Sequence, residues 1–275
     1  MIKILCDSII DLPTEIIKKY NIDIVPLTVI FNQKEYLDGV DITNKEFYKM
    51  LRESETMPKT SQATYAQFVK FFEKYKDDEI IYFAGSSVAS GTYQSAVLAK
   101  NDVDANITIF DTLNLSLGSG LLVLKACQMI ERGLCVDEIV KNLDSLKNDI
   151  EVVFSVDTLE YLKKGGRISS TKAALGSLLS IKPILSVKDG LVAQKSQVRG
   201  KKQIFTNLVN SIVEKYGNDL SEKTIFLGYG DNENDLVTLR ETLLNNTKVK
   251  DVYTLNIGCI ICSHSGPGVI GIACV

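Results

Sequence analysis

The sequence predicts an α/β protein with two domains: an N-terminal domain with a doubly wound, mostly parallel sheet, and a C-terminal α/β domain with a mixed sheet. In the first half, short apolar runs alternate with amphipathic segments of helical period, as in βαβ units. After residue 149 this alternation stops, and Asp189-Gly190 between two apolar runs indicates an antiparallel hairpin. A length of 275 residues suits two domains, which we place at 1–149 and 150–275.

The elements of the first domain follow from local signals. Pro13 suits the first turn of a helix, and Thr43 with Glu46 forms a capping box at the start of another. Gly133 follows the end of a long apolar helix, and Pro26 indicates an edge or bulge in the second strand. The expected strands are 2–6, 23–31, 79–84 and 106–110, and the expected helices are 13–20, 44–52, 65–75, one beginning near 92, 116–132 and 137–147.

The second domain is expected to mix antiparallel pairs with helices. Strands are expected at 151–156, 184–187, 191–196, 224–229, 252–257 and 269–274, and helices at 159–164, 201–216 and 234–244. The segment 173–181 is apolar and contains small residues, so it could line a slot for an acyl chain. Packing in the core is the simpler interpretation of that segment.

The tract 83–93 follows an apolar run and leads into a helix-forming stretch, so it predicts a strand, a hydroxyl-rich turn and a helix start. The first N–H groups of a helix have no partner inside the helix and carry the positive end of its dipole, so they can bind an anion. Gly85 and Gly91 allow close approach, and Ser90 offers a donor. An ordinary N-cap before a packed helix is the alternative, which the tract leaves open.

Polar residues gather at points that a doubly wound sheet would bring to one edge. In such a sheet the ligand binds beyond the carboxyl ends of the strands. The polar points are Asp7-Ser8, Thr60-Ser61-Gln62, the tract around Ser90, and Asp111-Thr112. Caps alone would explain most of them, but together they supply hydroxyls without a cation. Such a neutral site suits a carboxylate better than a polyphosphate.

Three further side chains are candidates for a site. His264 is the single histidine and lies in a Gly-rich segment that we expect to be a loop, where it could donate to an acidic ligand or be structural. Arg167 follows a pair of glycines and Arg199 precedes a glycine. Each guanidinium could bind a phosphate or the carboxylate of a partner protein, or be a solvated charge.

Cysteine usage indicates reduced thiols. Most of the six cysteines lie in apolar runs, which suits buried thiols better than disulfides. Cys259 and Cys262 have C-x-x-C spacing, but the isoleucines between them indicate a strand interior and no second pair completes a zinc site. The sequence leaves a redox role for this pair open.

Composition and missing motifs exclude several functions. The net charge is −3 and the basic residues are scattered among acids, which argues against nucleic acid as a partner. Neither a signal-peptide pattern nor an apolar run of spanning length occurs, so we expect a cytoplasmic protein without a transmembrane segment. Neither a P-loop nor a dinucleotide fingerprint occurs, and we expect no cofactor and no metal.

A serine hydrolase acting on acyl esters is the alternative function. Ser87 or Ser90 would act with His264 in that case. The tract Gly85-Ser86-Ser87-Val88-Ala89 is close to G-x-S-x-G but ends in Ala, and an acidic partner for His264 is not evident.

Ordered motifs run through the whole chain. They are C-D-S at 6–8, D-L-P at 11–13, V-P-L at 25–27, Y-L-D-G-V-D-I at 36–42, P-K-T-S-Q at 58–62, S-S at 86–87 with S-G-T-Y at 90–93, D-T-L-E-Y-L-K-K-G-G-R-I-S at 157–169, V-R-G at 198–200, and His264 with G-P-G at 266–268. In this order they resemble the DegV family of bacterial fatty-acid-binding proteins.

The resemblance implies that a long-chain fatty acid lies in a tunnel between the two domains. Residues at the positions of Thr60, Ser61, Ser90, Gly91 and His264 would bind its carboxylate. The arginines at the positions of Arg167 and Arg199 would contact a phosphate or a kinase.

The resemblance also implies a partner, a separate ATP-binding fatty acid kinase subunit that converts the bound acid to an acyl phosphate. The chain would then be a lipid-carrier subunit without catalytic residues of its own. Transient contact of this subunit with a membrane surface is compatible with that role. Cys262-Ser263 and Val88-Ala89 depart from common family residues. Such differences would change the surroundings of His264 and the preferred acyl chain.

Overall fold

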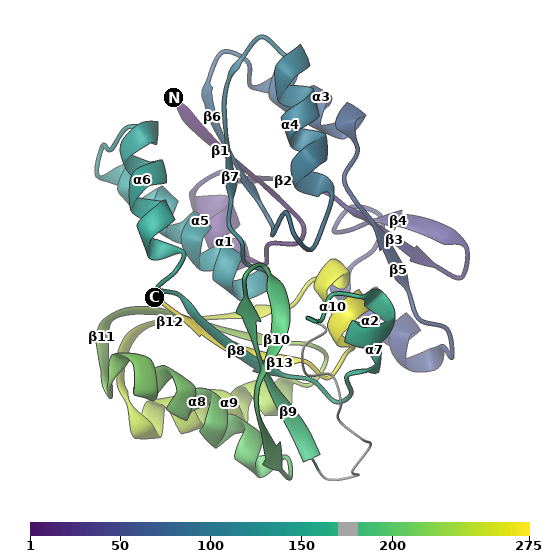
Figure 1. Cartoon of the computed structure of the whole chain (residues 1–275), viewed down its shortest axis with the longest axis vertical. Coiled ribbons are helices and arrows are strands. Elements are labelled where there is room, and N and C mark those ends of the chain that lie inside the picture. Colours follow the sequence, from purple (N-terminus) through teal and green to yellow (C-terminus); the bar gives the residue numbers. More distant parts are fainter. Residues whose placement is uncertain (170–180) are drawn as a thin grey trace.

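The computed structural model describes residues 1–169 and 181–275 and contains the parallel sheet and the mixed sheet that the sequence predicts (Figure 1). The expected slot-lining segment 173–181 lies outside the described residues except for Ile181.

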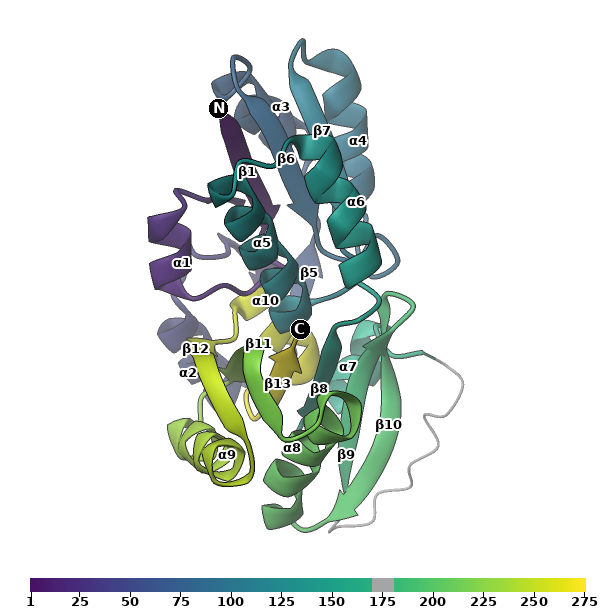
Figure 2. The same cartoon turned by 90° about the vertical axis from the view of Figure 1, so that its left-hand side faces the viewer.

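The first sheet is parallel and doubly wound. It consists of β1 (Ile2–Asp7), β2 (Asp23–Val25), β6 (Glu79–Ala84) and β7 (Asn106–Asp111), in the order β2-β1-β6-β7. Its two faces are covered by α3 (Tyr65–Lys74) and α4 (Thr92–Asp102), and by α1 (Thr14–Lys19), α5 (Ser116–Glu131) and α6 (Val136–Leu146) (Figures 1 and 2). Because strand residues alternate in direction, Leu5 packs in one core while Ile4 and Cys6 pack in the other.

A small antiparallel sheet was not expected from the sequence. It consists of β3 (Thr28–Phe31), β4 (Lys34–Leu37) and β5 (Lys59–Ser61), in the order β4-β3-β5. The single strand expected at 23–31 is wrong, because β2 and β3 belong to different sheets and Pro26 lies between them. Asn32 and Gln33 adopt φ values of 51° and 66°, as a tight hairpin requires. The short, polar β4 and β5 lack the apolar alternation that marks a strand.

The second large sheet is mixed. It consists of β8 (Glu151–Ser155), β9 (Ile181–Lys188), β10 (Leu191–Arg199), β11 (Asp219–Tyr229), β12 (Lys248–Asn256) and β13 (Ile270–Cys274), in the order β10-β9-β8-β13-β11-β12. Only β11 and β12 pair in parallel among these strands. Asp189 and Gly190 form the predicted hairpin turn, both with positive φ. The sheet is accompanied by α7 (Glu160–Gly165), α8 (Lys202–Tyr216) and α9 (Glu233–Asn246).

Helix α5 lies between the two large sheets and packs against both. Its buried side chains share one core with Phe83 of β6 and Phe226 of β11. The closest approach is at Gly120, where a Cβ atom would lie 2.2 Å from the carbonyl oxygen of Asp11 and 3.1 Å from the Phe226 ring. The helix therefore joins the two large sheets through one continuous core.

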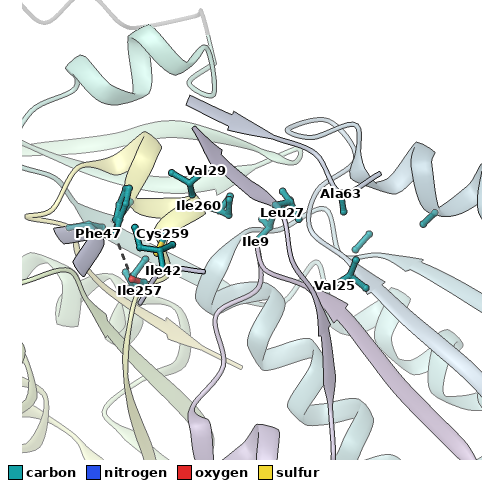
Figure 3. Packing of buried hydrophobic residues seen from close by; sticks show 14 of the residues in the cluster. Ile9, Val25, Leu27, Val29, Ile42, Phe47, Ala63, Ile257, Cys259 and Ile260 are labelled. Atoms are coloured by element: carbon teal, nitrogen blue, oxygen red, sulfur yellow. Dashed lines mark hydrogen bonds between the residues drawn. The ribbon is translucent and has the colours of Figure 1, made fainter. Parts of the chain in front are cut away.

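His264, Cys259 and Cys262 lie on a helix, which corrects the expected loop and strand interior. This helix, α10 (Cys259–Ser265), packs against α2 (Asn44–Glu53), β3 and β5. Figure 3 shows Ile257, Cys259 and Ile260 among the core residues Ile9, Leu27, Val29, Ile42 and Phe47. A short apolar run such as this one carries too few residues for its period to distinguish helix from strand.

We propose that the chain divides at residues 149 and 150, as the sequence predicts. Residues before this point build the parallel sheet and the small sheet, and residues after it build the mixed sheet. Helix α10 crosses the division, because its sequence belongs to the second part while it packs against the first part.

A Gly120→Ala substitution should destabilise the protein. In an open helix this change would favour folding by up to about 1 kcal/mol, but here the new methyl group meets the backbone of Asp11. We expect a net loss of about 1 to 3 kcal/mol in the free energy of unfolding, measured with urea.

Gly118→Ala is the matched control in the same helix. Its Cβ atom would meet the side chains of Asn114 and Val152 rather than backbone, so its relief requires movement of side chains only. The packing argument is wrong if Gly118→Ala costs as much stability as Gly120→Ala.

Candidate functional site

A cavity of about 370 Å³ lies between the two parts of the chain, and its wall is mostly apolar. The apolar lining residues are Ile9, Leu27, Leu115, Leu117, Val152, Phe154, Leu162, Val187, Val192, Ile257, Ile260, Ile261 and Val269. They come from the β1 loop, the start of α5, β8, β9, β10, α10 and their connections. The volume and the apolar wall are typical of a small-molecule site.

Seven residues of the cavity lining that carry polar side chains or a helix start are named here the polar patch. It comprises Thr60, Ser61, Gln62, Ser90, Gly91, Arg167 and His264; Ser116 and Ser265 also line the cavity. The patch thus joins β5, the start of α4, the segment after α7, and α10. All of these residues except Gln62 are candidate site residues in the sequence analysis: Arg167 as a contact to a phosphate or kinase, and the others as ligands of the carboxylate.

Thr60 and His264 form the centre of the patch. Pairing of β5 with β3 places Thr60 opposite Val29, and the last turn of α10 brings His264 to it. The distance from Thr60 Oγ1 to His264 Nε2 is 2.9 Å. His264 Nδ1 is buried and has no hydrogen-bond partner within the described part of the chain.

His264 is held in its neutral form. Burial and, as the smaller cause, the positive charge of Arg167 together lower the pKa of the imidazole to about 4. A neutral imidazole has one N–H donor and one acceptor nitrogen. His264 therefore adds no charge to the patch near neutral pH, while its Nε2 pairs with Thr60 Oγ1.

Arg167 supplies the positive charge of the patch. Its Nε donates to the carbonyl oxygen of Ala89 at 3.1 Å, and its Nη1 donates to that of Gly165 at 2.6 Å. These bonds fix the guanidinium between the loop before α4 and the end of α7. The absence of a Cβ at Gly165 also lets the His264 ring pack there, because a Cβ would lie 2.3 Å from His264 Nδ1.

Ser90 and Gly91 stand at the start of α4, as the sequence predicts. Gly91 is the N-cap and gives the helix no side-chain cap, while Ser90 Oγ lies 2.9 Å from Thr92 Oγ1. Gln62 ties this start to β5 by donating to Ser95 Oγ at 2.8 Å. The positive end of the α4 dipole thus borders the cavity.

Two of the polar points expected at the sheet edge do not line the cavity. Asp7 accepts bonds from the Tyr82 hydroxyl and from the N–H groups of Ile9 and Gly85, so it is structural. Thr112 donates to a backbone carbonyl at the end of β6. Such bonds depend on loop geometry, which a sequence pattern does not contain.

The structure also places three further features of the predicted site. Thr60 and Ser61 lie on strand β5. Arg199 is exposed at the end of β10 and lies outside the cavity lining. The sequence predicts that residues 150–275 cover an acyl chain but does not name the lining residues of β8, β9 and β10, although the alternation of Val152 and Phe154 along β8 is a signal that could have indicated them.

The arrangement does not form a serine triad among the described residues. Ser87 lies outside the cavity lining, and its N–H donates to Asp111. The Nε2 atom of His264 is bonded to Thr60, and within the described chain no carboxylate holds the other ring nitrogen. The geometry therefore does not favour the hydrolase alternative.

Cys259 and Cys262 are both buried in α10, where burial raises the pKa of each thiol well above its usual range. Cys262 Sγ lies 3.0 Å from the Tyr48 hydroxyl.

Among residues 1–169 and 181–275, no group of three or more His, Cys, Asp or Glu side chains is placed so that it could hold a metal ion. Helices long and apolar enough to cross a bilayer are also absent from these two ranges.

The fold and the cavity define an α/β protein with an interior apolar site and one polar patch. A family model described as an uncharacterised protein of the DegV family matches residues 1–275, and the chain belongs to this family. A DegV domain-containing protein of Clostridium perfringens is 40% identical over 279 residues, covering 98% of this chain and 95% of that protein. A fatty acid-binding protein of Thermotoga maritima is 36% identical over 282 residues, covering 98% and 96%.

Solved structures share the whole fold. A structure of a DegV family protein from Thermus thermophilus, described by its fatty acid binding, has a TM-score of 0.91 and 32% identity and covers 99% of this chain and 98% of that one. A stearic acid-binding protein from Eubacterium ventriosum has a TM-score of 0.89 and 29% identity, covering 100% and 98%.

The single histidine makes its pKa directly measurable by NMR. In protein refolded after denaturation to remove small molecules, we expect the His264 signal to titrate near 4, below the ordinary value of about 6.5. Arg167→Ala should raise this pKa, because it removes the second cause of the shift. In the unfolded chain the pKa of the histidine is about 6.5. The contribution of neutral His264 to the free energy of unfolding is therefore present above pH 6.5 and is lost as the pH falls to about 4.

Arg199→Ala is the control, because it removes the same charge from outside the cavity. It should leave the pKa of His264 unchanged. A wild-type pKa of about 6 or higher would contradict the burial and charge arguments.

Proposed function

We propose that this protein binds a long-chain fatty acid, with the carboxylate at the polar patch and the acyl chain against the apolar wall. The observation that carries the proposal is a single cavity that joins hydroxyls, a neutral histidine and a helix start to an extended hydrocarbon surface. The carboxylate ligands in this proposal are Thr60, Ser61, Ser90, Gly91 and His264.

The pair of Thr60 and His264 always retains a donor. If the threonine hydroxyl donates to Nε2, the histidine carries its proton on the unpartnered Nδ1. If Nε2 donates to the threonine, the hydroxyl hydrogen stays available. A carboxylate accepts hydrogen bonds only, so the tautomer that leaves the threonine hydrogen available suits it, whereas Nδ1 is buried against Gly165.

The charge of the site fits a single negative group. Arg167 provides one positive charge, and the start of α4 adds the partial positive charge of a helix N-terminus. A polyphosphate would require more cations than the patch contains. The cavity therefore favours a carboxylate head over a nucleotide.

The apolar wall favours a long chain over a short one. Burial of each methylene contributes about 0.8 kcal/mol, so affinity grows with every carbon that the wall covers. The printed descriptions of relatives from Thermotoga, Thermus and Eubacterium support this assignment, because they name fatty acid or stearic acid as the ligand of those proteins.

We further propose that the chain presents the bound carboxylate to an ATP-binding kinase subunit, which forms the acyl phosphate. In this proposal the chain is a carrier and not an enzyme by itself. Arg167 borders the carboxylate position, and the exposed Arg199 is free to contact a partner protein. Exchange of the acid at a cytoplasmic membrane surface belongs to the same proposal.

Thr60→Ala and Ser90→Ala should each weaken fatty acid binding. Each change removes a hydrogen bond to a charged group, worth about 1.5 to 3 kcal/mol, so we expect affinity to fall by about 10- to 150-fold. The measurement is titration with oleate of protein freed of lipid by denaturation and extraction. Mass spectrometry of the extract also identifies any acid bound during expression.

Ser87→Ala is the matched control, because this neighbouring hydroxyl lies outside the cavity lining. Its affinity should equal that of the wild type, and Thr60→Ser should retain most of the binding. An empty extract together with no binding of added fatty acids would refute the proposed function.

Arg199→Ala should leave oleate affinity unchanged and lower the rate of acyl phosphate formation with a bacterial fatty acid kinase subunit by at least about tenfold. The physical reason is that Arg199 lies outside the cavity but is exposed to a partner. Arg240→Ala removes another exposed charge, on α9, and should leave the rate unchanged. If the wild type, Arg199→Ala and Arg240→Ala form acyl phosphate at equal rates, Arg199 does not contact the kinase.

A further inference from the structure

Two buried carboxyl groups lie at the start of α10, behind the wall of the cavity. Asp11 is 6% exposed and Asp38 is 7% exposed. Both come from loops of the first part of the chain, whereas α10 belongs to the second part. Neither residue lines the cavity, so the proposed carboxylate site does not explain their burial.

Asp11 connects two segments that border the cavity. Its Oδ1 accepts the N–H of Gly258 at 2.8 Å, at the N-cap of α10. Its Oδ2 accepts the hydroxyl of Ser116 at 2.5 Å, at the first residue of α5. Gly258 allows the contact, because a Cβ there would lie 2.9 Å from Asp11 Oδ1.

Asp38 reaches the next residues of the same helix. Burial raises the pKa of its carboxyl, while hydrogen bonds from Cys259, from the N–H of Ile260 and from Ser8 lower it. Burial also raises the pKa of Asp11 to about 7. Asp11 therefore binds the N–H at the N-cap of α10, and Asp38 lies beside the same helix start, where a Cβ on Gly258 would lie 3.7 Å from Asp38 Oδ2. This start is the positive end of the helix.

Other contacts hold the chain before α10 but do not reach its first N–H groups. The Tyr48 hydroxyl donates to the carbonyl oxygen of Ile257, and Asn44 Nδ2 donates to the same atom at 3.3 Å. These bonds fix the entry to the helix. Asn44 and Tyr48 also contact α10 itself, at the thiols of Cys259 (3.4 Å) and Cys262 (3.0 Å), whereas Asp11 binds the N–H at the N-cap of the helix.

Movement at the start of α10 is transmitted to the cavity. Ile260 and His264 are four residues apart, so they lie on one face of the helix, and both line the cavity. His264 contacts Thr60 at 2.9 Å, and a hydrogen bond tolerates only a few tenths of an ångström beyond this distance.

We propose that Asp11 and Asp38 are positioning residues that fix helix α10 and thereby hold His264 in its buried contact with Thr60. The consequence for fatty acid affinity rests on the function proposed above. The placement of His264 in the empty protein does not depend on that function.

The pKa of His264, measured by NMR on lipid-free protein, tests this proposal. Asp11→Ala and Asp38→Ala should each raise this pKa by about one unit or more, because a displaced ring is better solvated. The pKa of His264 in the wild type is lowered by burial and by the charge of Arg167. Neither Asp11 nor Asp38 is a cause of that shift. Direct loss of a nearby negative charge would lower the pKa, so a rise reports movement of the helix.

Glu15→Ala is the control, because this exposed carboxylate borders the same outer groove as Asp11 and Asp38. It should leave the pKa of His264 unchanged. If the alanine variants do not fold, Asp11→Asn and Asp38→Asn replace them. Each asparagine keeps an acceptor for the helix but loses the charge, and we expect a smaller rise in the same direction.

The proposal is overturned if the folded variants keep the wild-type pKa of His264, even when their melting temperatures fall. A fall in the pKa would overturn it as well. Oleate affinity should weaken at least about fivefold in the variants that raise the pKa. If that pKa rises while the wild type itself does not bind oleate, the positioning role stands and the proposed function fails.

Discussion

The site depends on the docking of α10 into the core of the first part of the chain. Ile257, Cys259 and Ile260 pack among side chains of the small sheet and α2. This contact places His264 within hydrogen-bond distance of Thr60, a residue 204 positions earlier in the sequence. The same helix supplies part of the cavity wall. Without this packing the polar patch would lose its histidine and the apolar wall would be open to solvent.

Burial and one fixed charge together set the chemistry of the patch. Arg167 is held by carbonyl oxygens rather than by a carboxylate, so its charge is not neutralised by a partner in those contacts. That charge and the surrounding protein keep His264 neutral. The patch thus combines neutral donors with a single cation, which matches the charge of one carboxylate. Helix α5 maintains this geometry by joining the two large sheets in one core.

Local signals were sufficient where a residue acts on its own segment. The capping box of Thr43 and the Asp189-Gly190 turn were predicted and confirmed, because each operates within a few residues. The small sheet was missed because β4 and β5 are short and polar and are stabilised by pairing with β3. The helical form of α10 was missed for a related reason. Its N-cap residue Gly258 donates to Asp11, which is distant in sequence.

The sequence by itself determined most strands and helices of the two large sheets, the mixed α/β class, and the set of polar residues from which a site could be built. Periodicity and turn residues encode these properties locally. Only the tertiary structure decided which polar residues meet. It brought Thr60, Ser90, Arg167 and His264 together and left Asp7 and Thr112 to structural hydrogen bonds. The physical reason is that contacts between distant segments depend on packing in three dimensions, which no local pattern specifies.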